Sequence, residues 1–360
     1  MFGGRSTEHA VSCISAGSVL AAIDRDRYDV VAVGIARDGR WVLAGDDPAR
    51  LAPVGDQLPE VDREGASVVL AGDPTRHGLA VQEPGQVPAE LGAVDVVLPL
   101  LHGPFGEDGT LQGLLELAGV PYVGSGVFAS AAAMDKGHMK ALLQAAGIPV
   151  GPYAVITPRD WARDPAAVRE TVAGLGFPVF VKPARAGSSV GITKVHTPES
   201  LDAAIEAARE HDPRVVVEAM IEGREIECGV LEGLDGAAPD ASVPGEVVVG
   251  GDHEFYDFAA KYLPDQGTDL HVPADLPDHV AADVQELARR AFDALGCEGL
   301  ARVDFFLVRD GSVIVNEVNT MPGFTPVSMF PLMWKATGVD YPDLVDRLVQ
   351  TALSRPSGLR

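Results

Sequence analysis

Two short polar segments near the C-terminus have the composition of a metal and anion site. They are Arg302-Val303-Asp304 and Asn316-Glu317-Val318-Asn319-Thr320, each within a run rich in β-branched and aromatic residues, with an Asp-Gly turn between the runs. This pattern predicts a hairpin. Because side chains alternate along a strand, Arg302 shares a face with Asp304, and Glu317 with Asn319. Two carboxylates, one amide oxygen and one guanidinium would then converge, which suits Mg²⁺ and a developing negative charge. Taken alone, an amphipathic hairpin with a solvated polar face explains the pattern equally.

The composition restricts the class of partner. The chain has 360 residues, enough for two or three domains, and is 46% apolar. It has no run of roughly 20 apolar residues to span a membrane, and its first residues lack the pattern of a secretory signal. A formal net charge of −24 argues against nucleic-acid and anionic-membrane partners. Cys13, Cys228 and Cys297 follow no metal-ligand spacing, so we expect buried thiols in a reducing cytoplasm.

The expected elements divide into an N-terminal α/β region and later α+β modules. Alternation in the first third predicts an open sheet whose ligand edge lies at the strand C-termini, and residues 44–93 read as loops and edge strands. Expected strands are 28–35, 94–100, 179–182, 191–195, 215–218, 225–231 and 246–249. Expected helices are 11–23, 110–118, 126–146 (broken near Met134), 199–210 and 278–295.

The start of the chain departs from this pattern. Gly3-Gly4 reads as the turn after a first strand, yet only two residues precede it. Either the strand is absent, or the natural start lies upstream of Met1, which is the interpretation we favour.

Candidate nucleotide contacts lie in the middle of the chain. Lys182 ends a strand and precedes a Gly/Ser-rich loop, 184–191, whose backbone N–H groups could cradle phosphates. Lys136 lies in a helical stretch, and Glu218 leads into an apolar hinge that could receive an adenine. Individually, a plain hairpin turn, a surface lysine and a sheet edge explain these features as well.

Loops that precede helices are candidate substrate contacts. Segments 3–9 and 98–110 both run through a glycine-rich turn to a helix start. Glu8 is then either a first-turn helix carboxylate or an anion for a substrate ammonium. Segment 320–329 could present backbone N–H groups and start a helix at about Ser328, a natural carboxylate site. Segment 255–262 is an aromatic-rich loop with one lysine, for which core packing is the default interpretation.

In this order, the motifs closely resemble the D-alanine–D-alanine ligase family of ATP-grasp enzymes, from residue 3 to about residue 350. The resemblance implies a mixed α/β and α+β fold: an open-sheet N-terminal domain followed by a two-part ATP-grasp fold. The expected domains are an N-terminal substrate-side domain at 1–124 with its first strand missing, a central lobe at 125–217, and a C-terminal lobe at 218–360 that carries the metal and substrate site.

The resemblance also implies ATP and two Mg²⁺ ions as cofactors, with Mn²⁺ as an alternative. The residues implied for the nucleotide are Lys136, Lys182 and Lys261 at the phosphates, Glu218, Ala219 and Ile221 at the adenine, and Glu225 at the ribose. The implied metal ligands are Asp304, Glu317 and Asn319.

The family's reaction assigns further roles. One D-alanine forms an acyl phosphate, which the amino group of a second D-alanine attacks, and Arg302 and the Gly323 N–H would stabilise the oxyanion. Glu8 would pair with the ammonium of the first D-alanine. The remaining implied roles are a lid and proton network of Ser188, Tyr262 and Glu8, a carboxylate site of Ser328 and the Met329 N–H, and His102 as a second-site residue supported by Glu107.

The resemblance leaves the acceptor partly open. Tyr262 matches members that make the dipeptide, and Ala186 stands where some members carry a charged residue. A D-alanine–D-lactate ligase, another ATP-grasp carboxylate–amine ligase and an inactive nucleotide-binding regulator are the alternatives. The resemblance further implies a cytoplasmic homodimer that supplies peptidoglycan precursor synthesis.

Overall fold

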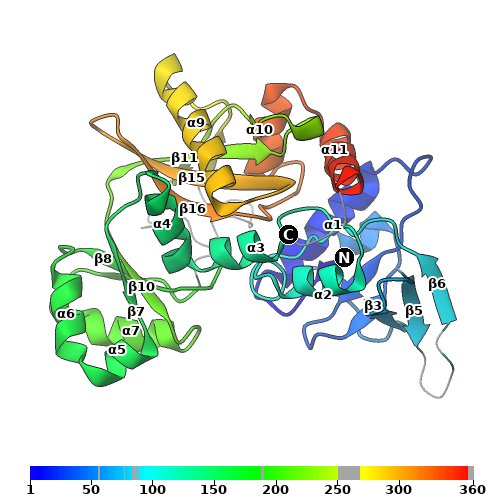
Figure 1. Cartoon of the computed structure of the whole chain (residues 1–360), viewed down its shortest axis with the longest axis horizontal. Coiled ribbons are helices and arrows are strands. Elements are labelled where there is room, and N and C mark those ends of the chain that lie inside the picture. The colour runs from blue at the N-terminus through cyan, green and yellow to red at the C-terminus, as the bar shows by residue number, and fades with distance from the viewer. Residues whose placement is uncertain are drawn as a thin grey trace.

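The computed structural model describes residues 1–55, 57–76, 78–82, 87, 89–187, 190–249 and 268–355. In these residues the strands form three sheets that follow one another along the chain. Figure 1 shows the N-terminal sheet on the right, the second sheet at the lower left, and the third sheet between and above them.

The N-terminal sheet has the strand order β1-β2-β3-β4-β5-β6. Strands β1 and β2 run parallel and the later pairs are antiparallel. The bounds are β1 (Phe2–Gly3), β2 (Val33–Ile35), β3 (Trp41–Leu43), β4 (Ser67–Leu70), β5 (Gly78–Gln82) and β6 (Ala89–Ala93).

The expectation of a missing first strand is wrong, because a short one is present. Phe2 is buried, pairs with Gly34 in β2, and forms a parallel bridge to Leu100. The backbone of Met1 extends this pairing through hydrogen bonds to Leu98 O and Leu100 N, both of 2.8 Å.

Two of the expected N-terminal strands are shorter than predicted. Segment 94–100 makes only isolated bridges at Val97 and Leu100. Pro99 has no N–H to donate to a ladder, which accounts for the interruption. Segment 28–35 is a strand only from Val33, since the Tyr28 N–H turns back to Asp24 O.

The helices of the first half start and end close to the predicted positions. They are α1 (His9–Ala22), α2 (Thr110–Ala118), α3 (Val127–Met134) and α4 (Lys136–Ala145). The break between α3 and α4 is confirmed: Asp135 caps α4 by accepting hydrogen bonds from the N–H groups of Gly137 and His138. Although they precede the second sheet, α3 and α4 pack against α9 and the third sheet.

The second sheet is antiparallel, with the order β7-β10-β8-β9. Val179 and Val181 of β8 are fully buried against Leu201 and Ile205, so the intervening Lys182 lies on the opposite face. The elements are β7 (Tyr153–Ile156), α5 (Pro158–Arg163), α6 (Pro165–Ala173), β8 (Val179–Pro183), β9 (Thr193–Val195), α7 (Leu201–Arg209) and β10 (Val215–Ala219).

The third sheet has the order β14-β13-β11-β15-β16, with β12 paired to β11. Its strands are β11 (Gly223–Leu231), β12 (Asp240–Ala241), β13 (Gly245–Val249), β14 (Thr268–His271), β15 (Leu300–Val308) and β16 (Val313–Asn319). Helix α9 (Asp278–Leu295) covers one face (Figure 1), where Val303, Phe305 and Leu307 of β15 are buried. Arg302 and Asp304 therefore lie on the other face.

The remaining helices and the cysteines complete the core. Helices α10 (Met329–Thr337) and α11 (Tyr341–Ser354) pack together with α1, and short 3₁₀ turns span Pro48–Leu51, Pro198–Ser200 and Leu234–Gly236. The three cysteines are buried free thiols, as predicted, and burial raises the pKa of each to about 12. Among the described residues, no helix has both the length and the apolar character needed to cross a bilayer.

Candidate active site

A cavity of about 510 Å³ is lined by strands of the second and third sheets, together with helices and loops that include the start of α1. All of the predicted site residues that the structure describes line it: Glu8, His102, Lys136, Lys182, Glu218, Ala219, Ile221, Glu225, Arg302, Asp304, Glu317, Asn319, Gly323, Ser328 and Met329. Ser188, Lys261 and Tyr262 lie outside the described residues.

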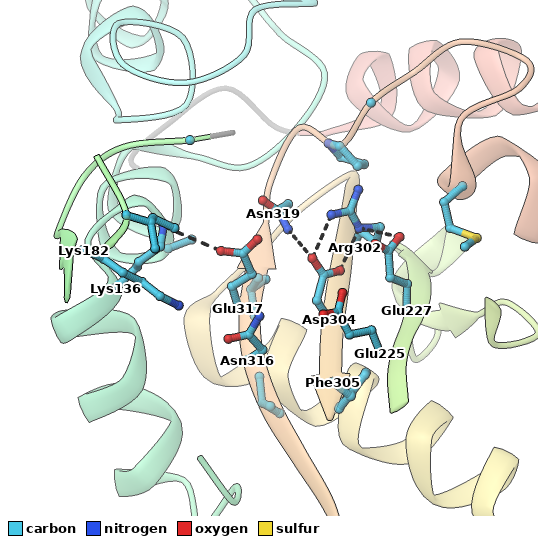
Figure 2. A pocket seen from close by; sticks show the side chains of 18 of the residues that line it. Lys136, Lys182, Glu225, Glu227, Arg302, Asp304, Phe305, Asn316, Glu317 and Asn319 are labelled. Carbon is cyan, nitrogen blue, oxygen red and sulfur yellow. Dashed lines mark hydrogen bonds and ion pairs between the residues drawn. The ribbon is translucent and has the colours of Figure 1, made fainter. Parts of the chain in front are cut away.

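The β15–β16 hairpin forms one wall of the cavity. Arg302 is in register with Asn319, and Asp304 with Glu317. The Arg302 guanidinium donates two hydrogen bonds of 2.7 Å to the Asp304 carboxylate, and Asn319 Nδ2 donates one of 3.0 Å (Figure 2). The predicted convergence of these side chains is therefore confirmed. The alternative, an amphipathic hairpin whose polar face is solvated, is excluded.

Glu227 is a member of this wall that the sequence analysis missed. It lies on β11 beside Asp304, is only 5% exposed, and its carboxylate is 2.9 Å from Arg302 Nε. Burial alone would lower the pKa of Arg302, but the carboxylates of Asp304 and Glu227 raise it well above its ordinary value. Strand alternation could have indicated Glu227, because it lies two residues after Glu225 and therefore on the same face of the strand.

Two lysines reach the opposite side of the same cavity. Lys136 Nζ donates a 3.0 Å hydrogen bond to Ala186 O at the start of the Gly/Ser-rich loop and lies 3.6 Å from Glu317 Oε2. Lys182 Nζ donates a 2.5 Å hydrogen bond to Glu218 Oε2. Figure 2 shows Lys136 and Lys182 on one side of Glu317, and Asp304, Arg302 and Glu227 on the other. The alternative of a surface lysine is wrong for Lys136.

Glu218 has a second cationic neighbour that the sequence analysis also missed. Lys140 Nζ is 3.1 Å from Glu218 Oε1, and its side chain is 3% exposed. Burial alone would raise the pKa of Glu218, but Lys182 and Lys140 lower it to about 2. The four-residue spacing from Lys136 places Lys140 on the same face of α4, which could have indicated it. The Glu218 carboxylate is thus engaged by lysines, while the hinge after it lines the cavity.

Glu8 lies where the N-terminal region meets the Gly/Ser-rich loop. It precedes α1 but makes no side-chain cap hydrogen bond, so it does not act as a helix-capping carboxylate. It is buried, and a Cβ atom built on Gly103 or Gly187 would lie 2.7 Å or 2.5 Å from its Oε2 atom. The carboxylate is therefore flanked by two glycines from separate segments, where a larger side chain would displace it.

His102 and Glu107 both bond to the backbone of Met321. His102 Nδ1 lies 3.0 Å from Met321 O, and Glu107 accepts hydrogen bonds from the N–H groups of Met321 (3.0 Å) and Gly103 (2.7 Å). Burial lowers the pKa of His102, whereas burial and the Glu8 carboxylate raise the pKa of Glu107 to about 8. Together they fix the backbone of the segment that leads to Gly323.

The predicted helix start at Ser328 is confirmed. Ser328 is the N-cap of α10 and Met329 its first residue. The Ser328 hydroxyl accepts a 3.1 Å hydrogen bond from Thr325 N and lies 2.8 Å from Thr325 Oγ1. Because the first N–H groups of a helix have no intrahelical acceptor, this end of the cavity suits an anion.

Comparison with known proteins identifies the family. A family model described as the D-ala D-ala ligase N-terminus matches residues 1–125, and one described as the D-ala D-ala ligase C-terminus matches residues 142–350. The chain belongs to the D-Ala–D-Ala ligase family. The D-alanine–D-alanine ligase of Pseudarthrobacter chlorophenolicus is 59% identical, covering 100% of this chain and 94% of the relative. That of Streptomyces griseus subsp. griseus is 58% identical, covering 100% and 93%.

Solved structures of ligases have the same fold. The VanG D-Ala:D-Ser ligase from Enterococcus faecalis superimposes with a TM-score of 0.84 at 37% identity, over 98% of this chain and 97% of that one. The D-alanine-D-alanine ligase from Coxiella burnetii gives a TM-score of 0.80 at 36% identity, over 98% and 92%. The predicted family and fold class are therefore confirmed.

Proposed function

We propose that the protein joins two D-alanine molecules to D-alanyl-D-alanine for peptidoglycan precursor synthesis, converting ATP to ADP and phosphate. Family membership implies small-molecule substrates and the use of ATP. The proposal rests mainly on one observation. Lys136 and Lys182 lie on one side of a single cavity, and Arg302, Asp304 and Glu317 lie on the hairpin that forms its other side.

The nucleotide would bind between the second and third sheets. Lys136 and Lys182 supply positive charge for its phosphates, and Lys261 is a proposed third cation. The apolar hinge at Ala219 and Ile221 would hold the adenine, and Glu225 the ribose hydroxyls. In a chain of net charge −24, such local cations are what allow a polyphosphate to bind.

The residues of the hairpin wall fit a divalent cation. Asp304, Glu317 and Asn319 present the hard oxygen donors that Mg²⁺ prefers, and Mn²⁺ is an alternative. No group of three His, Cys, Asp or Glu side chains with a metal-binding arrangement occurs in the described part of the chain, so each of the two proposed ions would complete its shell with phosphate oxygens and water. When bound, the ions would offset charge on the transferring phosphoryl group.

The chain's own side chains then position the amino acids. Glu8 would hold the ammonium of the first D-alanine, whose carboxylate attacks the γ-phosphorus to form an acyl phosphate as ADP leaves. Ser328 and the Met329 N–H would hold the carboxylate of the second D-alanine, in the region that His102 fixes through Met321.

The second D-alanine completes the reaction. Its neutral amino group attacks the acyl carbon, the amine proton is lost, and phosphate leaves. Arg302 and the Gly323 N–H would stabilise the oxyanion of the tetrahedral intermediate. Ser188 and Tyr262, together with Glu8, are the proposed lid and proton network.

The test is phosphate release by the purified protein with ATP, Mg²⁺ and D-alanine, together with detection of the dipeptide. D-Serine and D-lactate are supplied in parallel as acceptors, because the VanG neighbour is a D-Ala:D-Ser ligase. Turnover only with another acceptor would overturn the substrate assignment. ATP binding without turnover of any acceptor would favour a nucleotide-binding regulator instead.

The remaining parts of the proposal concern organisation. We propose a cytoplasmic homodimer with domains at 1–124, 125–217 and 218–360; helices α3 and α4, within the second of these, pack on the third sheet. Sedimentation of the active protein at the mass of one 37.7 kDa chain would contradict the dimer.

A further inference from the structure

One buried carboxylate of the cavity lies between two ammonium groups from different elements. Glu218 at the end of β10 contacts Lys182 of β8 at 2.5 Å and Lys140 of α4 at 3.1 Å. The side chains of Glu218, Lys182 and Lys140 are 10%, 13% and 3% exposed. Two cations thus face one anion in a region with little water.

The two lysines differ in how they are held. Lys140 Nζ also donates a 3.1 Å hydrogen bond to Asn316 O on β16, and its neighbour Met139 is fully buried. Lys140 is therefore fixed to the third sheet as well as to Glu218. Lys182 lines the cavity beside the Gly/Ser-rich loop and has the Glu218 carboxylate as its hydrogen-bond acceptor.

Binding of a nucleotide changes the charge balance at this point. If Lys182 binds phosphate, as the proposed function requires, the phosphate competes with Glu218 for its ammonium group, and Glu218 loses part or all of this cation. A buried carboxylate that loses its only cation is strongly destabilised, because neither water nor another charge replaces it. Lys140 is placed so that Glu218 keeps a cation when Lys182 binds phosphate.

We propose that Lys140 is a positioning residue that acts as the permanent counter-ion of Glu218, so that Lys182 can transfer from Glu218 to a nucleotide phosphate. The inference rests on the proposed function in assigning Lys182 to phosphate. It goes beyond that function by explaining why Glu218 has two lysine partners, of which Lys140 is also hydrogen-bonded to the third sheet.

A purely structural role for Lys140 is the competing explanation. In that case Lys140 only ties α4 to β16, and its loss would weaken all nucleotides alike or only lower stability. The counter-ion role predicts a selective loss of phosphate-dependent affinity. It also predicts that removing the negative charge of Glu218 restores this affinity.

The experiment compares the dissociation constants of ATP and adenosine, measured by calorimetry in Mg²⁺. In Lys140→Met we expect the preference for ATP over adenosine to fall roughly 10- to 100-fold, because Glu218 retains Lys182, with adenosine affinity unchanged. Lys140→Arg keeps the charge and should keep most of the preference. The matched control is Lys335→Met on α10, where an exposed lysine away from this cavity is lost and no change is expected.

The double variant Lys140→Met/Glu218→Gln is decisive, because without the carboxylate Lys182 is released and the ATP preference should return. An unchanged preference in Lys140→Met, or no recovery in the double variant, would overturn the inference. If Lys140→Met does not fold, Lys140→Gln removes the charge but keeps a hydrogen-bond donor, and the same loss of ATP preference is expected. Failure of the proposed function is a separate result: the wild-type protein would release no phosphate with D-alanine.

Discussion

Replacing Arg302 with alanine should lower kcat strongly while leaving ATP binding in place. Arg302 is the cation that links Asp304 and Glu227 across β15 and β11, and it is the proposed oxyanion contact. The substitution therefore removes a proposed catalytic charge and a buried structural charge at the same time, and the two effects can be measured separately.

The expected magnitudes follow from these contacts. Loss of one oxyanion donor lowers kcat about 10²- to 10³-fold. Loss of the guanidinium also leaves Glu227, whose side chain is 6% exposed, without its 2.9 Å cationic partner. Removing one member of a buried ion pair costs about 3–5 kcal/mol in the free energy of unfolding. Asp304 is affected less, because Asn319 still donates to it.

Phosphate release gives kcat, calorimetry gives the dissociation constant for ATP, and urea denaturation gives the free energy of unfolding. Arg302→Lys is the control, since it keeps the charge but lacks the planar fork that contacts both Asp304 oxygens. It should recover part of the stability and little of the activity. A folded Arg302→Ala protein with kcat within tenfold of the wild type would refute the assigned role.

Three further predictions concern the amino-acid site, the metal and the core. Glu8→Gln should raise the KM for D-alanine about 10- to 100-fold with little change in ATP affinity. Gly187→Ala should also raise this KM, because the new methyl group would displace the Glu8 carboxylate. Steady-state kinetics at saturating ATP test both variants, and an unchanged KM in Glu8→Gln would contradict the assignment of Glu8. Chelation with EDTA should stop phosphate release and added Mg²⁺ restore it, whereas adenosine binding should persist; turnover in EDTA would exclude the metal site. The free energy of unfolding should fall as the pH drops below 6.5, because burial lowers the pKa of His9, and the unfolded chain then binds a proton that the folded chain binds only at lower pH. His9 Nδ1 lies 2.7 Å from Gly4 O, and its Nε2 accepts a hydrogen bond from Val61 N. In His9→Gln, the free energy of unfolding measured by urea denaturation should therefore depend less on pH between about pH 5 and pH 8. An equal pH dependence in the variant would show that other groups cause it.

Local patterns predicted the parts of the fold in which one segment determines its own conformation. Alternating side chains and the Asp-Gly turn were sufficient for the β15–β16 hairpin, and with it for the meeting of Arg302, Asp304 and Asn319. The predicted helices at 110–118 and 278–295 have the observed bounds, since each combines an amphipathic pattern with a C-terminal glycine in the left-handed region.

The contacts that the sequence did not predict are those between distant segments. Nothing in the local pattern of Lys140 or Glu218 indicates that α4 and β10 meet, so their ion pair emerged only from the three-dimensional arrangement. Likewise, the short first strand is stabilised by Gly34 and Leu100, which are far away in the sequence. The assignment of Lys261, Tyr262 and Ser188 rests on resemblance alone.

The division of the cavity into a strand-built wall and loop-built walls has an evolutionary consequence. Arg302, Asp304 and Glu227 are paired with one another on neighbouring strands, so a mutation there that evades an inhibitor would also threaten folding. The walls around Gly103, Gly187 and the segment before α10 are built from loops instead of paired strands, so substitutions there should alter substrate binding more than folding. Compounds anchored on the hairpin should therefore meet resistance more slowly than compounds that depend on the loops.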